Sequence, residues 1–173
     1  MNCNLRFTHK KNNLKFSSGY TLIEILVALT VVGIIFSFGF VNFREFSRRQ
    51  EVISVARSLK GDLRLAQEQA LAGKKPDGLE CGGVNTLSGY RFNVKSPVNY
   101  VIEAECGGGI SQTKDVTLPS DLSLSSPSPN PIIFKILGQG TNIPAASESV
   151  ITLTQVGTNN STTITVTSGG EIK

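Results

Sequence analysis

One apolar stretch near the N-terminus constrains this chain more than any other feature. Between Glu24 and Arg44 there is no charged residue, so residues 25–43 form a neutral run of 19. Counted from Tyr20, the segment would make about 36 Å of α-helix at the usual rise per residue, which is enough to span a bilayer core. The sequence therefore predicts a transmembrane helix over residues 20–43.

A single acid lies at the start of this segment. Glu24 costs at most about 3 kcal/mol at the bilayer centre, which is less than the apolar residues contribute, so insertion is still favoured. One interpretation is an interfacial acid tolerated near a helix terminus. The other is that Glu24 pairs with a cation, namely the α-amino group that a cut between Gly19 and Tyr20 would create. We favour the second interpretation.

The distribution of charge supports a cut at this position. The first 19 residues carry four basic side chains and no acid, which accounts for the whole net charge of +4. Their removal leaves 13 Lys and Arg against 13 Asp and Glu. A basic leader should stay on the cytoplasmic side of the membrane while the rest is exported. Because no small-x-small site follows the apolar segment, we expect the helix to be retained.

These residues resemble the signal of type IV pilins and pseudopilins. That signal, the class III leader, is a basic peptide ending in Gly, then an aromatic residue, Thr-Leu-Ile-Glu and an apolar helix; here it reads Gly19-Tyr-Thr-Leu-Ile-Glu24. The resemblance implies that a prepilin peptidase removes residues 1–19 and methylates the new N-terminus at Tyr20, where the family usually has Phe. It also implies that Glu24 pairs with the N-terminal amine of a neighbouring subunit during filament assembly.

A second resemblance concerns residues 55–70, which are similar to the helix of the GspH/FimT type of minor pseudopilin. Those proteins tend to carry the pattern L-x-x-x-L-R-x-A-R-x-x-A, which begins here at Leu59 and ends at Ala70. Gln67 stands where the pattern has its second Arg. In that type, strands follow the helix, and the last strand ends in a Gly turn, here residues 169–170.

The exported part, residues 44–173, has the size of one domain. Within residues 44–72, apolar side chains recur every three or four positions, which predicts an amphipathic helix that continues the membrane segment. Gly73 and Pro76 predict its end. Over residues 79–173, β-branched runs alternate with turn residues, as strands do. A helix followed by strands predicts an α+β fold, with the helix packed on an antiparallel β-sheet.

The expected strands are short, and they are residues 90–94, 100–105, 116–118, 132–137, 150–154 and 163–167. We expect residues 123–131, which are rich in Ser and Pro, to form a rigid loop. Glu103 and Glu105 alternate along one strand, and we expect both to face solvent. The glycine-rich stretches 107–109 and 138–140 lack the strand-to-helix context of phosphate-binding loops, so we expect turns there.

Removal of the leader would also remove Cys3, which leaves two cysteines. Cys81 and Cys106 are each followed by Gly-Gly, and an even number in an exported domain predicts a disulfide. Two free buried thiols are the main alternative. A metal site is disfavoured because two Cys residues without His supply only half of a structural zinc shell.

The sequence offers little for catalysis. The only histidine, His9, lies in the leader. The retained part therefore has no His to activate a nucleophile or to bind a metal. We expect no enzyme activity, no catalytic residue, no cofactor, no metal and no small-molecule substrate.

Two functions remain open. The first is a structural subunit, a minor pilin or pseudopilin of a type IV pilus or type II secretion pseudopilus. It would cross the inner membrane once, with its C-terminal domain exported, and then join other pilin subunits in a periplasmic or extracellular filament. The alternative is a ligand-binding module at the filament tip, such as a DNA-capture minor pilin in natural transformation. Nucleic acid is a weakly supported partner because phosphate binding needs clustered cations, whereas the cations here are scattered: Lys74, Lys75, Arg91, Lys95 and Lys114.

Overall fold

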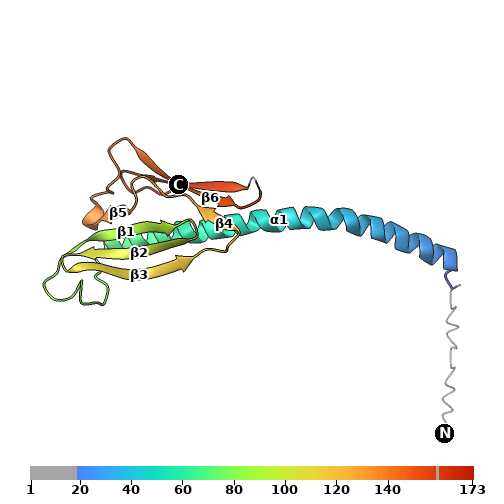
Figure 1. Ribbon diagram of the computed structural model, residues 1–173, viewed down its shortest axis with the longest axis horizontal. Helices are drawn as coiled ribbons and strands as arrows, with labels where there is room; N and C mark the ends of the chain where they lie inside the picture. Colours follow the sequence, from blue (N-terminus) through green and yellow to red (C-terminus); the bar gives the residue numbers. More distant parts are fainter. Residues whose placement is uncertain (1–18, 159) are drawn as a thin grey trace, which may run out of the picture. The chain divides into compact units, whose positions relative to one another are not determined.

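The computed structural model describes residues 19–158 and 160–173, except for the side chains of residues 38–42. The chain divides into two compact units, Met1–Phe43 and Arg44–Lys173. A single helix, α1 (Leu22–Leu71), contributes residues to both units (Figure 1). The predicted leader lies outside the described residues except for Gly19.

In the first unit, α1 begins where Thr21 caps it. The backbone oxygen of Thr21 accepts hydrogen bonds from the backbone nitrogens of Glu24 and Ile25, at 3.1 Å and 3.2 Å. The Thr21 hydroxyl accepts a longer one, 3.4 Å, from the nitrogen of Glu24. A Thr followed three residues later by Glu is the sequence of a capping box. The helix therefore begins two residues after Tyr20, at Leu22.

The described side chains of the first unit are all exposed. Leu22 and Leu29, for example, keep 83% and 66% of their full exposure. Among the described residues, no helix combines the length and the apolarity needed to cross a membrane. The transmembrane helix over residues 20–43 thus stays a prediction, and it includes residues 38–42, whose side chains lie outside the described part.

In the second unit, α1 supplies one side of the core. Its buried apolar side chains recur along one face, as the sequence predicted: Val52, Leu59, Leu63, Ala66 and Ala70. The helix ends at Leu71, one residue before the predicted end. Gly73 then adopts a φ of 60°, a left-handed conformation that glycine reaches without a steric penalty. The nitrogens of Gly73 and Lys74 donate to the oxygens of Ala70 and Gln69, which completes a Schellman C-cap.

The first sheet is antiparallel throughout, with strand order β3-β2-β1-β5. Its strands are β1 (Leu87–Ser96), β2 (Asn99–Cys106), β3 (Gly109–Thr117) and β5 (Ile132–Lys135). Phe92 in the central strand β1 pairs with Ile102 on β2 and with Ile132 on β5. All three side chains are buried in the core.

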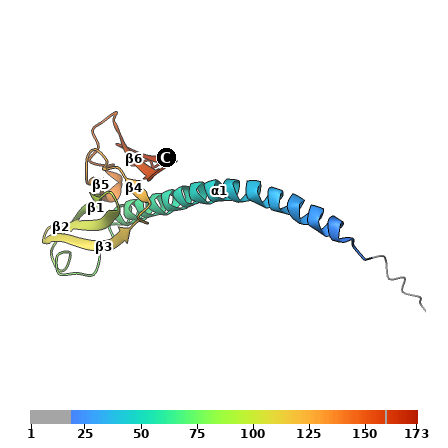
Figure 2. The ribbon, with the colours of Figure 1, turned by 45° about the vertical axis from the view of Figure 1, so that its right-hand side comes forward.

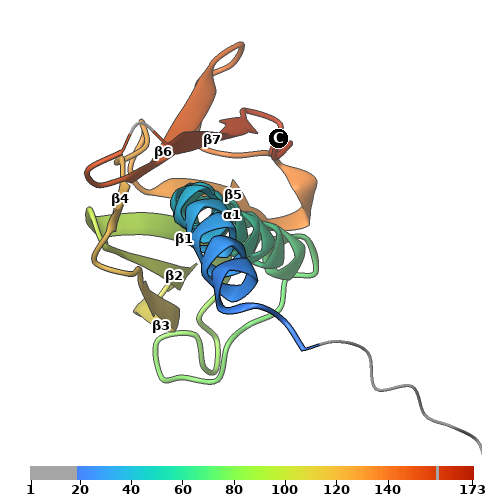
Figure 3. The same ribbon diagram turned by 90° about the vertical axis from the view of Figure 1, so that its right-hand side faces the viewer.

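The second sheet is also antiparallel, with strand order β4-β6-β7. Its strands are β4 (Leu122–Leu124), β6 (Glu148–Gln155) and β7 (Ser161–Thr167). A short 3₁₀ helix, η1 (Ile136–Gly138), follows β5. Viewed down α1, the strands β1–β3 and the strands β6 and β7 lie on different sides of the helix (Figure 3). Both sheets and α1 share one core cluster.

The predicted α+β fold with antiparallel strands is confirmed, with local corrections. The predicted loop 123–131 is wrong at its start, because Ser123 and Leu124 belong to β4. Leu122 and Leu124 are both buried, with the half-buried Ser123 between them. This alternation of buried and less buried side chains covers only three residues, which is too short to be recognised in the sequence. The predicted strand 132–137 is too long, since the chain turns into η1 at Ile136. Strand β3 begins seven residues before the predicted strand 116–118, in a polar and exposed stretch that carried no apolar signal.

Candidate processing and assembly site

The predicted cleavage position lies in exposed backbone ahead of the helix. Gly19 and Tyr20 precede α1 and have no regular secondary structure. Tyr20 keeps 77% of its full exposure. Proteolytic cuts concentrate in exposed chain termini and loops, where the backbone is not tied into secondary structure. A peptidase can therefore reach the peptide bond between these two residues.

Glu24 lies in the first turn of α1, four positions after Tyr20, and is exposed. A carboxylate there is favourably placed at the positive end of the helix dipole. Among the described residues, no Lys or Arg lies within ion-pair distance of it. A cation from outside the described part of the chain can therefore approach this carboxylate.

Cys81 and Cys106 are joined in a disulfide, with their Cα atoms 5.2 Å apart. Cys106 ends β2, and Cys81 lies in the loop between α1 and β1, so the bond fastens this loop to the first sheet. Both side chains are buried. The part of the chain that the structure describes contains no group of three or more His, Cys, Asp or Glu that could hold a metal ion.

Three of the five cations considered for nucleic acid are engaged with carboxylates. Arg91 and Lys95 both approach Glu103, at 3.1 Å and 3.5 Å, and Lys114 lies 2.6 Å from Asp62. The remaining two, Lys74 and Lys75, are exposed directly after α1 and line a pocket of about 390 Å³ together with polar side chains. Two adjacent cations make a small site compared with the charged stripe that a nucleic-acid backbone needs.

Glu103 corrects one of the sequence predictions. It was expected to face solvent, but it keeps only 6% of its full exposure. Its cross-strand partner is Arg91, whose Nε lies 3.1 Å from Glu103 Oε2, although the two atoms are not in hydrogen-bond geometry. The side chains of Arg91 and Lys95 lie beside the Glu103 carboxylate. Their positive ends offset its negative charge, while the apolar stems of such side chains can exclude water from it. Glu105, by contrast, is half-buried at the end of β2.

Asp62 is a buried acid on the core side of α1. The Tyr100 hydroxyl on β2 donates a hydrogen bond of 2.8 Å to Asp62 Oδ2, and the Lys114 ammonium on β3 donates one of 2.6 Å to Oδ1. Burial raises the pKa of Tyr100 far above its usual range, and the hydrogen bond and negative charge of Asp62 raise it further. These contacts tie α1 to two neighbouring strands.

Alkaline conditions are expected to weaken this contact between helix and sheet. The pKa of Tyr100 is raised from about 10 in the folded chain, so above pH 10 the unfolded chain loses a proton that the folded chain keeps. Stability from the neutral phenol is therefore complete below about pH 10 and is lost as the pH rises beyond it. Thermal unfolding of the full chain across this range should show a falling midpoint. The fall should be smaller in Tyr100→Phe, and an equal fall in both chains would contradict this assignment.

Gln67 connects α1 to the C-terminal turn. Its Nε2 donates a hydrogen bond of 2.9 Å to the backbone oxygen of Gly170. Gly170 has a φ of 93°, a left-handed conformation that favours glycine. Lys173 continues past this turn and pairs with Thr165 of β7. Gln67, which stands where the GspH/FimT-like pattern has its second Arg, therefore holds the C-terminal Gly turn against α1.

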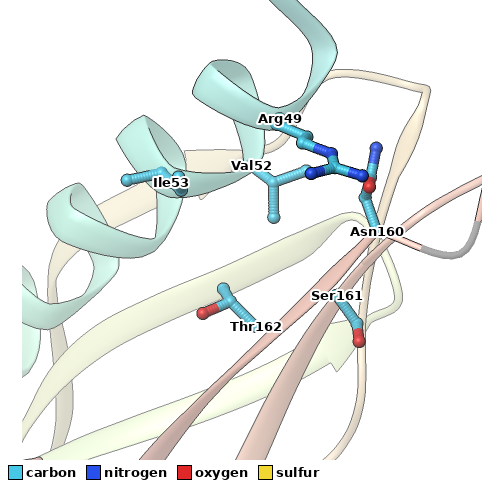
Figure 4. A pocket seen from close by; sticks show the side chains of 6 residues that line it. All are labelled: Arg49, Val52, Ile53, Asn160, Ser161 and Thr162. Carbon is cyan, nitrogen blue, oxygen red and sulfur yellow. The ribbon is translucent and has the colours of Figure 1, made fainter. Parts of the chain in front are cut away.

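A pocket of about 370 Å³, which we call the β7 pocket, lies between α1 and the start of β7 in the second unit. Figure 4 shows its lining residues, with the Arg49 side chain next to Asn160: Arg49, Val52, Ile53, Asn160, Ser161 and Thr162. Val52 is buried, whereas Arg49 and Ser161 are exposed. This pocket could not be predicted from the sequence, because its two walls, residues 49–53 and 160–162, are far apart along the chain.

The long capped helix and the antiparallel strands packed on it are consistent with an α+β pilin fold. Residues 14–40 match a protein-family model described as the prokaryotic N-terminal methylation motif. The match includes Gly19, Tyr20 and Glu24, and it supports a type IV pilin-like prepilin that is processed by prepilin peptidase and assembles with other pilin subunits. No significant match was found among the curated proteins or the solved structures.

Sequence reasoning missed the buried polar groups of the second unit. Asp62 lies directly beside the apolar stripe of α1, next to Leu63, and an acid in that position is a recognisable signal of a paired buried charge. Glu103 carried no such signal. Its burial depends on Arg91 lying opposite it, and that register is set by strand pairing.

Proposed function

We propose that this chain is a structural subunit, a minor pilin or pseudopilin, of a type IV pilus or a type II secretion pseudopilus. The observation that carries the proposal is the methylation motif over residues 14–40, which ends in an exposed apolar helix. Prepilin peptidase would cut after Gly19 and methylate Tyr20. The C-terminal unit would then be the part of the subunit exposed on the filament.

The exposed apolar side chains of the first unit support this proposal. Large hydrophobic residues from Leu22 to Phe36 keep between 45% and 83% of their full exposure. Apolar surface of this extent is covered in working proteins by lipid or by partner chains. We propose that the inner membrane covers it before assembly, with the second unit exported, and that helices of neighbouring subunits cover it in the filament.

Glu24 would set the position of each subunit in the filament. An ion pair inside an apolar helix bundle is strongly stabilising only when its geometry is good, because both charges lose water. A Glu24 carboxylate paired with the Tyr20 amine of a neighbour would therefore favour one axial position of the subunit over the others. The exposure of both residues at the start of α1 is compatible with this contact.

Within this family, we propose that the chain is nearest to the GspH/FimT type. The support is the helix pattern from Leu59 to Ala70 and the contact of Gln67 with the Gly turn at Gly170. A tip module that captures DNA remains the second candidate, and only the exposed pair Lys74 and Lys75 favours it. A shift in the electrophoretic mobility of DNA on addition of the chain, weakening as salt is raised, would favour this candidate over a purely structural subunit.

Glu24→Ala tests the proposed assembly role. We expect membrane insertion and leader removal to persist, because the apolar helix and the cleavage position are unchanged, while incorporation into filaments falls about tenfold or more, as expected for loss of a well-formed ion pair of about 1.4 kcal/mol or more. Incorporation is measured by immunoblotting of sheared filaments against total membranes.

Glu45→Ala is the matched control for this variant. Glu45 is an exposed acid on the same helix, in the second unit, and its removal should leave incorporation unchanged. Normal incorporation of Glu24→Ala would exclude the proposed role of this carboxylate. Equal losses in both variants would show that the effect is one of general charge on α1.

A further inference from the structure

The β7 pocket combines one cation with hydrogen-bonding and apolar side chains. Its α1 wall is made of Arg49, Val52 and Ile53, and its β7 wall, residues 160–162, is polar and uncharged (Figure 4). The second sheet lies on a different side of α1 from β3, and none of the lining residues belongs to the first sheet (Figure 2). Small-molecule sites typically pair apolar walls with a few such polar groups, so this composition suits a small amphiphilic anion.

The β7 wall of the pocket is fixed by hydrogen bonds. The side-chain nitrogen of Asn160 donates 3.1 Å to Gln155 Oε1, and its backbone nitrogen donates 3.2 Å to the Thr158 hydroxyl. Gln155 is only 2% exposed, and its backbone nitrogen donates 2.9 Å to the oxygen of Asn160. A wall held in this way loses little conformational freedom when a ligand binds.

Arg49 is the only charged side chain that lines the pocket among the described residues. It is exposed, and no described carboxylate lies within ion-pair distance of it. Glu45 and Glu51, its acidic neighbours on α1, do not line the pocket, and neither does Asp121, which accepts a hydrogen bond of 3.5 Å from Gln155 Nε2. The planar guanidinium of arginine matches the oxygens of a phosphate. The pocket therefore favours a phosphate-bearing ligand.

The position of Arg49 in the sequence indicates where that phosphate comes from. Arg49 lies six residues after Phe43, the end of the predicted transmembrane helix, and Arg44 and Arg48 lie between them. Six residues of α-helix rise about 9 Å, and the headgroup layer on each side of a bilayer is about 5–8 Å deep. Helical side chains lean toward the N-terminus of their helix. With residues 20–43 in the membrane, the Arg49 guanidinium would thus reach the level of lipid phosphates.

We propose that the β7 pocket binds the phosphate of an anionic phospholipid of the inner membrane. Arg49 contacts the phosphate oxygens, the hydroxyls of Ser161 and Thr162 donate hydrogen bonds to the headgroup, and Ile53 packs against its glycerol carbons. This inference rests on the proposed function, in which the subunit enters the membrane before assembly, and deepens it by naming a lipid partner of the second unit. The contact forms in the membrane and breaks when the subunit leaves it.

Native mass spectrometry of the full chain in detergent tests the site. The chain is mixed with equal amounts of phosphatidylglycerol and phosphatidylcholine that carry the same acyl chains. We expect phosphatidylglycerol to be retained about threefold or more over phosphatidylcholine, whose ammonium group would lie near Arg49. Equal retention of the two lipids overturns the proposal. Binding of soluble glycerol 3-phosphate as tight as that of phosphatidylglycerol overturns the assignment to a lipid.

Two arginine variants separate the pocket from general charge. Arg49→Gln should lower the retention of phosphatidylglycerol about fivefold or more, because charge-assisted hydrogen bonds to the phosphate are lost. Arg48→Gln removes the same charge one position earlier, from an exposed residue that does not line the pocket, and should retain the lipid as the wild type does. Equal losses in the two variants would show binding by net charge alone and overturn the site.

Two threonine variants test the other wall. Thr162→Val removes a hydroxyl with little change of shape and should lower the retention about twofold or more. Thr163→Val makes the same change at the next residue of β7, whose side chain points to the opposite face of the strand, and should have no effect. Equal retention by the two overturns the site, because the lipid would then contact α1 alone. An unchanged thermal unfolding midpoint in each variant shows that folding is intact.

Incorporation into filaments, measured as for Glu24→Ala, separates this inference from the proposed function. If the chain shows no preference for phosphatidylglycerol but is still incorporated through Glu24, the lipid contact is overturned and the proposed function stands. If Arg49→Gln loses the lipid as expected but the wild-type chain is never incorporated, the contact stands and the proposed function fails.

Discussion

A Gly19→Val chain is expected to keep its leader. We predict that Gly19 is the last leader residue, and the bond that follows lies in exposed backbone. A peptidase must enclose this bond from both sides, and glycine leaves the most room for it. Valine adds a branched side chain directly beside the bond and restricts its conformation. We therefore expect near-complete loss of processing.

The consequence extends to charge and assembly. A retained leader keeps its four basic side chains, so the chain stays at a net charge of +4 and near pI 9.1, whereas the trimmed chain is neutral. The free amine of Tyr20, which we propose as the partner of Glu24 in a neighbouring subunit, is never created, so incorporation should fail as well. Isoelectric focusing and intact mass of the membrane-extracted chain measure the first effect directly.

Gly33→Ala is the control for this experiment. Gly33 lies inside α1, and a Cβ added there meets no other atom within 4 Å. The variant should lose its leader as the wild-type chain does. Removal of residues 1–19 from Gly19→Val at the wild-type rate would show that cleavage does not require glycine at this position.

Phe92→Ala is expected to cause the largest loss of stability. Phe92 is fully buried in the central strand β1, and its ring centroid lies 5.2 Å from that of Tyr100. Removing a buried Phe side chain leaves a cavity and typically costs about 3–5 kcal/mol of unfolding free energy. This is a large part of the stability of an ordinary domain, about 5–15 kcal/mol in total. The loss also removes the packing that positions Tyr100 against Asp62.

Denaturant unfolding of the full chain measures this effect. Phe92→Leu keeps most of the volume and should cost clearly less. Phe46→Ala removes the same side chain from a position on α1 that is 58% exposed, and it should stay within about 0.5 kcal/mol of the wild type. A small effect of Phe92→Ala, equal to that of Phe46→Ala, would contradict the central position assigned to this ring.

The helix of the second unit could be predicted because its signal is local. The buried face of α1 follows from residues three and four positions apart, such as Leu59 and Leu63, and its end follows from Gly73. The strands rich in β-branched residues were predicted for the same reason. The polar strand β3 was largely missed, because hydrogen bonds to β2 form it and its own side chains carry no alternating pattern.

The candidate site also has a part that could be predicted from the sequence and a part that could not. Gly19, Tyr20 and Glu24 were predicted from the sequence because processing signals are read as contiguous chain, and the family match covers the same residues. The β7 pocket was not predicted. It depends on how β7 returns to α1 across the core, which no short stretch of sequence encodes.

By itself, the sequence determined the processing signal, the apolar helix and the α+β class, since each depends on the order and spacing of neighbouring residues. Only the tertiary structure decided that Glu103 and Asp62 are buried with basic partners, and that α1 and the start of β7 enclose a pocket. The physical reason is that burial and charge pairing depend on strand register and helix packing. These bring together residues such as Asp62 and Lys114, which are 52 positions apart in the chain.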